Sequence, residues 1–194
     1  MALSAIALCS RALLKLGARP IAGFDEGTAE AEIAANLFPS IRDALLSAHG
    51  WSFASAQARL PLLEQQPTAD YTNSFQLPVD FLRAMSAGTG ATGRGTQFRI
   101  FDKQLQSNAH EIYLTYIYRP AEVDFPPFFD QLLIARLSAE FCIPVTESTS
   151  RAEMLYRLAE TEFRRAKLID AQQDTPLAVE AVSYTHLTLP TTHD

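Results

Sequence analysis

The segment Glu111-Ile-Tyr-Leu-Thr-Tyr-Ile-Tyr118 decides the fold class, because β-branched and aromatic residues fill most of it. Such residues pack well on a pleated surface and are typical of strands. On both sides of this region the chain carries the apolar spacing of amphipathic helices, with a period of about 3.6 residues. A sheet that lies between helical segments indicates an α+β protein.

Weaker strand patterns surround this segment and predict a small antiparallel sheet over residues 51–120. Residues 97–101 alternate between polar and apolar, and we expect them to pair with residues 111–118 through the polar turn around Ser107-Asn108. Residues 58–63 and 74–77 are weaker candidates, and Pro61 restricts the first of them to a sheet edge.

Two helices are predicted before the sheet, within residues 1–50. The apolar stripe of the first helix begins at Leu3, and Gly17 supplies a C-terminal stop. The second helix starts at Thr28, a residue type that caps helix N-termini, and runs to His49-Gly50. Pro39 lies inside this second stripe, so we expect it to kink or split the helix.

Two more helices are predicted after the sheet, over residues 126–175. The third helix starts after Pro126-Pro127 and ends at Pro144, whereas the fourth opens with the capping box Ser150–Glu153 and closes at Pro176. The predicted fold is therefore α+β and mainly α, with four main helices and a small antiparallel sheet inserted between the two pairs. Residues 1–182 are expected to form a single domain.

Residues 183–194 are treated separately, because this threonine-rich stretch breaks sharply from the helical pattern before it. The stretch resembles the translation of a sequencing-adapter read, a contaminant of metagenomic open reading frames. We therefore expect a non-native tail and leave it out of the fold prediction.

Composition excludes several classes of protein. The chain has 16 Lys and Arg against 22 Asp and Glu, a net charge of −6, which argues against a general binder of nucleic-acid backbones. Two cysteines exclude a disulfide framework and a cysteine-rich zinc site. No stretch approaches the roughly 18 apolar residues of a membrane span, and no cation precedes the apolar N-terminus as in a signal peptide.

One glycine-rich loop resembles a nucleotide-binding motif. Gly88-Thr-Gly-Ala-Thr-Gly93 matches G-x-G-x-x-G, which in a dinucleotide fold must open a helix that receives the pyrophosphate. A strand pattern follows here instead, so we interpret the segment as a hairpin loop and keep a nucleotide-binding enzyme as the alternative.

The sequence contains no histidine or cysteine spacing of a metal site and no Gly-x-Ser-x-Gly elbow. We therefore expect no enzyme activity, no metal and no cofactor.

The fourth predicted helix is rich in arginine. Its cations are interleaved with Glu153, Glu160 and Glu162 at spacings that suit pairs along one helix. The pattern favours a solvated face, and the alternatives are an arginine-bearing protein interface or a small helical DNA-binding module.

The order of landmarks along the chain resembles a known family. The landmarks are Ala12–Ile21, the long helix ending in His49-Gly-Trp-Ser-Phe53, the segment Phe75-Gln-Leu-Pro-Val-Asp-Phe-Leu-Arg83, the strand Ile112–Tyr118 running into Arg119-Pro120, and Phe128-Phe-Asp-Gln-Leu-Leu133. Together they resemble the head–tail connector or adaptor proteins of tailed phages, the group that includes tail tubular protein A. The likeness is greatest to the head–tail adaptor of gene transfer agents, and it covers about residues 1–175.

This resemblance implies a structural protein of a virion or virion-like particle, present in the host cytoplasm during assembly. Such adaptors form a ring, commonly a dodecamer, beneath the portal protein and present a platform to the tail or to stopper and terminator proteins. DNA passes through the lumen without sequence-specific contact, and no membrane is involved.

A ring subunit needs side surfaces that bury apolar and arginine residues against its neighbours. The chain has more phenylalanines than the core of four helices requires, and its last predicted helix carries several arginines. The candidate interface residues are Phe75, Phe81, Arg83, Phe128, Phe129, Arg157, Arg164 and Arg165.

We predict that removing every residue after Val182 leaves the melting temperature unchanged, because unpacked termini contribute little stability. Thermal unfolding of the full and shortened chains measures the difference. A loss of more than about 1 kcal/mol, the typical cost of removing real contacts, would show that the tail belongs to the fold.

Overall fold

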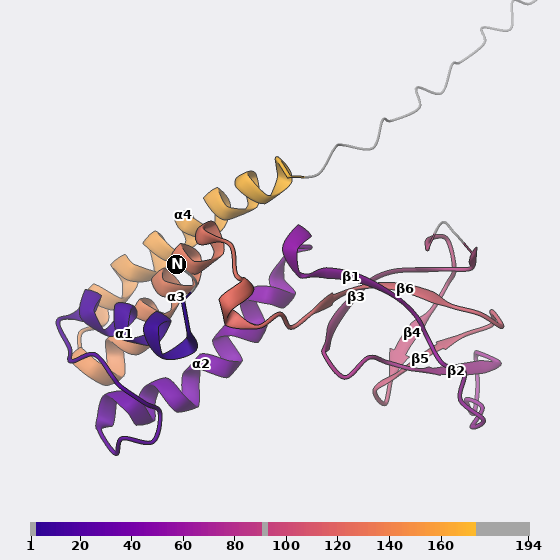
Figure 1. The fold of residues 1–194 in the computed structure, drawn as a ribbon, viewed down its shortest axis with the longest axis horizontal. Helices are drawn as coiled ribbons and strands as arrows, with labels where there is room; N and C mark the ends of the chain where they lie inside the picture. Colours follow the sequence, from indigo (N-terminus) through magenta and orange to yellow (C-terminus); the bar gives the residue numbers. More distant parts are fainter. Residues whose placement is uncertain (1–2, 91–92, 174–194) are drawn as a thin grey trace, which may run out of the picture.

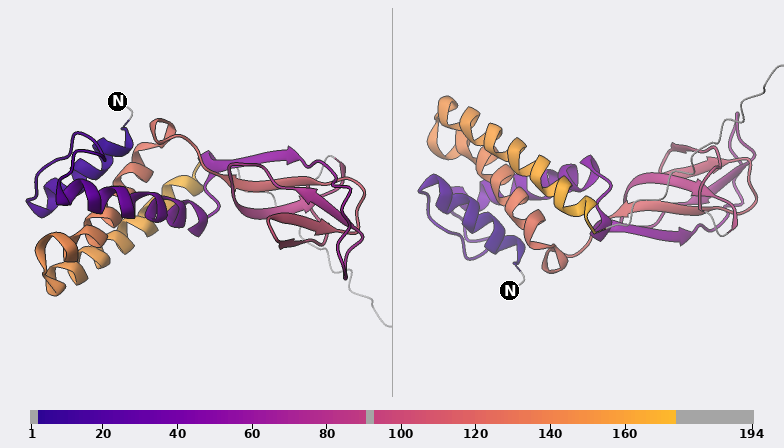
Figure 2. Two further views of the ribbon diagram at one scale, coloured as in Figure 1. Left: turned by 90° about the horizontal axis from the view of Figure 1, so that it is seen from below. Right: turned by 90° about the horizontal axis from the view of Figure 1, so that it is seen from above.

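The computed structural model describes residues 3–90 and 93–173, in which helices gather at one end of an elongated molecule and strands at the other (Figures 1 and 2). The helices of these residues are α1 (Ala5–Leu16), α2 (Ala29–Ala48), α3 (Pro127–Thr146) and α4 (Thr149–Ala171). The strands are β1 (Ser55–Arg59), β2 (Asn73–Gln76), β3 (Phe81–Gly88), β4 (Arg99–Phe101), β5 (Gln104–Ser107) and β6 (Tyr113–Tyr118). The predicted α+β class, mainly α, is confirmed.

The N-terminal helices begin and end where the sequence predicts. Gly17 ends α1 in the left-handed conformation, at φ 80°, and the hydroxyl of Thr28 caps α2 by accepting a hydrogen bond from Ala31 N at 3.3 Å. Pro39 does not split α2, which runs as one helix from Ala29 to Ala48. Pro39 and Ala35 are both exposed, so water can reach the carbonyl that the proline leaves without its usual donor.

The boundaries of the C-terminal helices differ from the prediction at the turn that joins them. Helix α3 continues past Pro144 to Thr146, and Glu147 then turns the chain at φ 54°. Ser148, not Ser150, caps α4, because its hydroxyl accepts a hydrogen bond from Arg151 N at 3.4 Å. The turn at Glu147 places the cap two residues earlier than the predicted capping box. Pro176 and the predicted tail at 183–194 lie outside the described residues.

Helix α3 is the centre of the helical lobe, which we define as α1 to α4. Most of its residues from Phe129 to Cys142 are buried, and it packs against α1, α2 and α4. A helix that is apolar on all sides must be surrounded by others, which explains its place. The buried hydroxyl of Ser138 is satisfied within the helix by Ile134 O at 2.7 Å.

The strands form a β lobe with two antiparallel sheets in the described residues, whereas the sequence predicts one. The sheet orders are β1-β6-β3 and β2-β5-β4. The strongest predicted strand contains β6, which is central in its sheet. Its expected pairing with residues 97–101 is wrong, because β4 pairs with β5 through a tight turn at Asp102 and Lys103. Both turn residues have positive φ, as in the two-residue turns that match strand twist.

Strands β3 and β5 are not predicted by the sequence pattern. Strand β3 breaks register against β6 at two places, so its inward and outward positions do not alternate regularly. Strand β5 is Gln104-Leu-Gln-Ser107, and three of its four residues are polar. The hydroxyl of its buried Ser107 donates a hydrogen bond to Gln97 O at 2.9 Å. This contact forms only in the folded chain.

The two lobes meet around Trp51, the sole tryptophan of the sequence, which is fully buried. Its indole Nε1 donates to Leu45 O, at the end of α2, at 2.9 Å. Its ring packs edge-on against Phe129 of α3 and Phe163 of α4, with centroid distances of 5.3 and 5.9 Å. Phe53, just before β1, lies 6.1 Å away. One side chain therefore contacts three helices and the entry to the β lobe.

We predict that Trp51→Ala lowers the free energy of unfolding by about 3–5 kcal/mol, because it leaves a large cavity among these rings. Trp51→Phe should cost less, since it keeps most of the packing and mainly loses the hydrogen bond to Leu45. Urea unfolding followed by circular dichroism measures both losses. Equal stability of Trp51→Ala and the natural chain would show that the lobes are held together elsewhere.

Candidate functional site

Two of the residues predicted at an interface are in the interior, so those two predictions are wrong. Phe75 and Phe129 are each 0% exposed. Phe75 fills the core of the β lobe with Leu105 and Leu114, whereas Phe129 packs against Trp51 in the helical lobe. The phenylalanines exceed the needs of a single four-helix core because each lobe has a core of its own.

Phe81 and Arg83 lie on β3 and are half-buried. The ring of Phe81 stacks on Tyr116 of β6 at 6.1 Å between centroids, so it contributes to the β lobe core. The guanidinium of Arg83 reaches back toward Gly50, beside the Trp51 junction. Its Nε atom is buried and has no hydrogen-bond partner among residues 3–90 and 93–173.

The remaining interface candidates gather on α3 and α4. Phe128 and Arg165 line one groove between these helices, together with Gln131, Glu162 and Ile169. Phe128 is half-buried and Arg165 is exposed. Arg157 and Arg164 are exposed elsewhere on α4. The structure thus brings Phe128 and Arg165 together in one groove and leaves Arg157 and Arg164 at other exposed positions of α4.

A larger groove lies between α2 and α4, with α3 as its floor, and the sequence analysis missed it. Its volume is about 510 Å³. Small residues at Ser40, Ala44 and Ala48 repeat every four positions on the α2 wall, and Ala159 and Phe163 form the α4 wall. The four-residue repeat of small side chains in α2 is the sequence signal that indicates such a surface.

A serine, a histidine and an aspartate meet at the junction, but their geometry does not form a nucleophilic triad. The hydroxyl of Ser52 donates to Asp170 Oδ1 at 2.6 Å, and Ser52 N donates to Asp170 Oδ2 at 3.0 Å. His49 Nε2 is 3.9 Å from Asp170 Oδ2. A triad requires the serine to bond to the histidine. Here the buried carboxylate of Asp170 instead fastens the end of α4 to the start of the β lobe.

Burial lowers the pKa of His49, and this effect outweighs the opposing attraction of Asp170. His49 is therefore held in its neutral form at neutral pH. It packs edge-on against Trp51 with a centroid distance of 4.9 Å. The His49–Asp170 contact is best described as packing beside a buried carboxylate.

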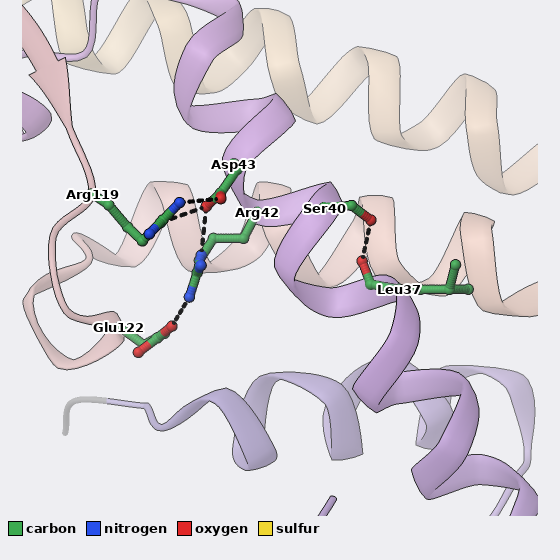
Figure 3. Close-up of polar contacts among 6 residues, drawn as sticks. All are labelled: Leu37, Ser40, Arg42, Asp43, Arg119 and Glu122. Atoms are coloured by element: carbon green, nitrogen blue, oxygen red, sulfur yellow. Dashed lines mark hydrogen bonds and ion pairs between the residues drawn. The ribbon is translucent and has the colours of Figure 1, made fainter. Parts of the chain in front are cut away.

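An ion-pair network ties the second connection between the lobes to α2 (Figure 3). The guanidinium of Arg119, just after β6, donates to both carboxylate oxygens of Asp43, at 3.0 and 2.6 Å. Arg42 bridges Asp43 and Glu122, which belongs to the short turn of helix at Glu122–Asp124. Burial raises the pKa of Asp43, but the hydrogen bonds from Arg119 and Arg42 more than offset it and lower the pKa overall.

No α-helix follows the glycine-rich loop among the described residues before β4. Gly88 ends β3, and a Cβ atom there would lie 2.1 Å from Arg94 N, so the chain returns tightly on itself. Thr96 N then donates to Ala87 O at 3.0 Å, and the next regular element is β4. A phosphate-binding loop of the dinucleotide type needs a helix N-terminus at this point.

Within residues 3–90 and 93–173, no group of three or more histidine, cysteine, aspartate or glutamate side chains is arranged to hold a metal ion. In the same residues, no helix is both long and apolar enough to cross a membrane. No protein-family model matches the chain, and no curated protein matches its sequence. The candidate functional site is therefore a surface, made up of the two grooves beside α4 and the arginines that this helix exposes.

Asp130, in the first turn of α3, is an unusual buried acid. It is 7% exposed, and its Oδ1 has no hydrogen-bond partner in the described part of the chain. Burial raises the pKa of Asp130 to about 6, more than the charge of Arg11 lowers it. Its pKa thus lies above the ordinary aspartate value of about 3.9.

We predict that Asp130→Asn stabilises the protein at about pH 8 and changes little at about pH 4. Because the pKa of Asp130 is raised in the folded state, its carboxyl group is protonated below about pH 4 in both the folded and the unfolded chain, and folding then has no charge to bury. As the pH rises to about 6 and above, folding must bury the ionised carboxylate, and the natural chain loses about 2–3 kcal/mol of unfolding free energy that Asp130→Asn keeps. Urea unfolding of both proteins across this range measures it. A difference that does not depend on pH would contradict the assignment.

Proposed function

We propose that this protein is a structural adaptor subunit at the head–tail joint of a tailed phage or gene transfer agent particle. In this role several copies form a ring beneath the portal protein and join it to the tail, while DNA passes through the lumen. The subunit acts by holding surfaces together and has no catalytic step.

The observation that carries the proposal is where the landmarks of the resemblance lie. His49–Phe53, the end of Phe75–Arg83, Arg119-Pro120 and Phe128–Leu133 are far apart in sequence but meet at the junction of the lobes. Trp51 packs against Phe53, Phe128 and Phe129. Arg119 N donates to Asp80 O at 3.0 Å, and the Tyr118 hydroxyl donates to Phe53 O at 3.4 Å. Segments that carry the family resemblance and also contact one another at the junction support a fold shared with the adaptor family better than segments that lie apart.

The surface chemistry also favours contact with other proteins. Large apolar side chains are exposed on both lobes: Leu14, Val123, Ile143, Met154, Leu158 and Leu168 on the helical lobe and its connections, and Leu62, Val79, Met85, Ile100 and Phe101 on the β lobe. On α4, Met154, Leu158 and Leu168 are exposed along one helix, and exposed apolar residues that cluster in this way favour a contact with another protein. The net charge of −6 suits a conduit that must let DNA pass, since anionic walls give no affinity from counterion release.

We predict that the purified chain is a monomer in dilute solution and assembles into a ring on a portal protein from the same gene cluster. A folded core in each lobe lets the subunit fold alone, whereas the portal supplies the symmetry of the ring. Light scattering tests the first statement, and electron microscopy of the mixture tests the second. A stable dodecamer without portal would contradict the monomer prediction.

The same preparation discriminates against the alternatives. Portal particles should gain a ring of extra density when the chain is added, and portal alone is the control. Absence of binding would overturn the proposed function. Saturable binding of ATP, NAD or short DNA in calorimetric titrations would instead favour the nucleotide-binding or DNA-binding reading.

A further inference from the structure

The groove between the start of α3 and the last turns of α4 has an apolar centre. Its volume is about 440 Å³, and Phe128, Ala166 and Ile169 form this centre. Phe128 and Ile169 are half-buried, so each still exposes part of an apolar side chain to water. Covering such surface is favourable. We call this cavity the α3–α4 groove; its lining is Pro127, Phe128, Gln131, Glu162, Arg165, Ala166 and Ile169.

An apolar stretch of sequence follows directly after the helix that borders this groove. Residues 174–182, which lie outside the described residues, read Asp-Thr-Pro-Leu-Ala-Val-Glu-Ala-Val, and most of them are apolar. Pro176 disfavours a straight continuation of α4, because proline lacks the backbone donor and restricts the residue before it. The chain can therefore change direction at this point. We call residues 174–182 the apolar segment.

The apolar segment is long enough to run back along α4 and cover the groove. Ile169, at the near end of the groove, is four residues before Gln173, and Glu162, at the far end, is eleven residues before it. At 1.5 Å per residue these positions lie about 6 and 16 Å back along the helix. Nine extended residues span about 30 Å. In the α2–α4 groove the nearest lining residue of α4 is Phe163, about 15 Å back, so that groove is less accessible to the segment.

The charges near the end of α4 also favour this segment. The exposed charged residues of α4 after Glu162 are all positive, namely Arg164, Arg165 and Lys167. Asp170, the acid in this stretch, is buried and accepts a hydrogen bond from the Ser52 hydroxyl. The apolar segment contains Asp174 and Glu180 and no basic residue. Of the exposed cations only Arg165 lines the groove, so apolar contact is the main interaction and charge is an addition to it.

We propose that residues 174–182 turn back along α4 and place their apolar side chains in the α3–α4 groove of the same chain. This inference goes beyond the proposed function and does not depend on it. The contact is intramolecular, so it agrees with a chain that is a monomer in dilute solution.

Cysteine cross-linking tests the contact in the full chain. Ala181→Cys places a thiol in the apolar segment, and Glu162→Cys places one at the far end of the groove, while the native Cys9 and Cys142 are buried. In the matched control, Arg164→Cys replaces Glu162→Cys. Arg164 is exposed, lies about half a turn around α4 from Glu162 and is closer to the segment along the chain.

A short thiol cross-linker should join Ala181→Cys to Glu162→Cys about tenfold faster than to Arg164→Cys, because docking raises the local concentration of the two thiols. The product should be a monomer whose yield does not depend on protein concentration. Circular dichroism establishes that both double variants are folded.

Two outcomes overturn the contact. Cross-linking to Arg164→Cys as fast as to Glu162→Cys would show that the segment does not occupy the groove, since an undocked segment reaches the closer position at least as readily. Cross-linked dimers whose yield rises with protein concentration would show that the groove takes the segment of another copy.

A substitution in the segment gives an independent measure. Leu177→Asp in the full chain should lower the melting temperature by about 2–4 °C, the shift expected from the loss of a modest apolar contact in a chain of this size. Leu187→Asp, the same change ten residues later in the predicted non-native tail, is the matched control and should leave the melting temperature unchanged. Equal melting temperatures of the two variants would overturn the contact.

Discussion

The burial of Trp51 is the interaction on which the arrangement of the two lobes depends. Its ring fills the space where the ends of α2 and α4 approach the start of α3, and its indole nitrogen is satisfied by Leu45 O. A buried indole without that acceptor would cost about 1–3 kcal/mol, so its orientation is set as well as its position. After Trp51 the chain continues through Ser52 and Phe53 into β1, and the position of the tryptophan fixes the direction in which β1 begins.

The chain passes twice between the lobes (Figure 1), and polar contacts secure both passages. The first passage, at Ser52, is held to the end of α4 by the buried carboxylate of Asp170. The second, after β6, is held to α2 by the pairing of Arg119 with Asp43. Since each lobe has its own apolar core, these contacts and the aromatic junction determine how one lobe is presented relative to the other.

In the adaptor role that we propose, the outside of the helical lobe supplies the surfaces that contact other proteins. Helix α3 is covered on most sides, and Phe75, Phe81 and Tyr116 of the β lobe lie in or against its core, whereas Phe101 is exposed. Helix α4 differs, because one side packs on α3 while the other exposes Leu158, Leu168 and a group of arginines. A helix with one packed side and exposed apolar and arginine side chains on the other suits the proposed role of an assembly subunit.

The sequence by itself determined the helices, their caps at Gly17 and Thr28, the strand at β6 and the α+β class, because these depend on local spacing and backbone preference. It predicted exposed arginines on α4 for the same reason. Only the tertiary structure decided that Phe75 and Phe129 are interior, that β4 pairs with β5, and that Asp170 binds Ser52. These outcomes depend on contacts between residues far apart in the chain, where register, burial and the number of cores are set by packing that local patterns do not encode.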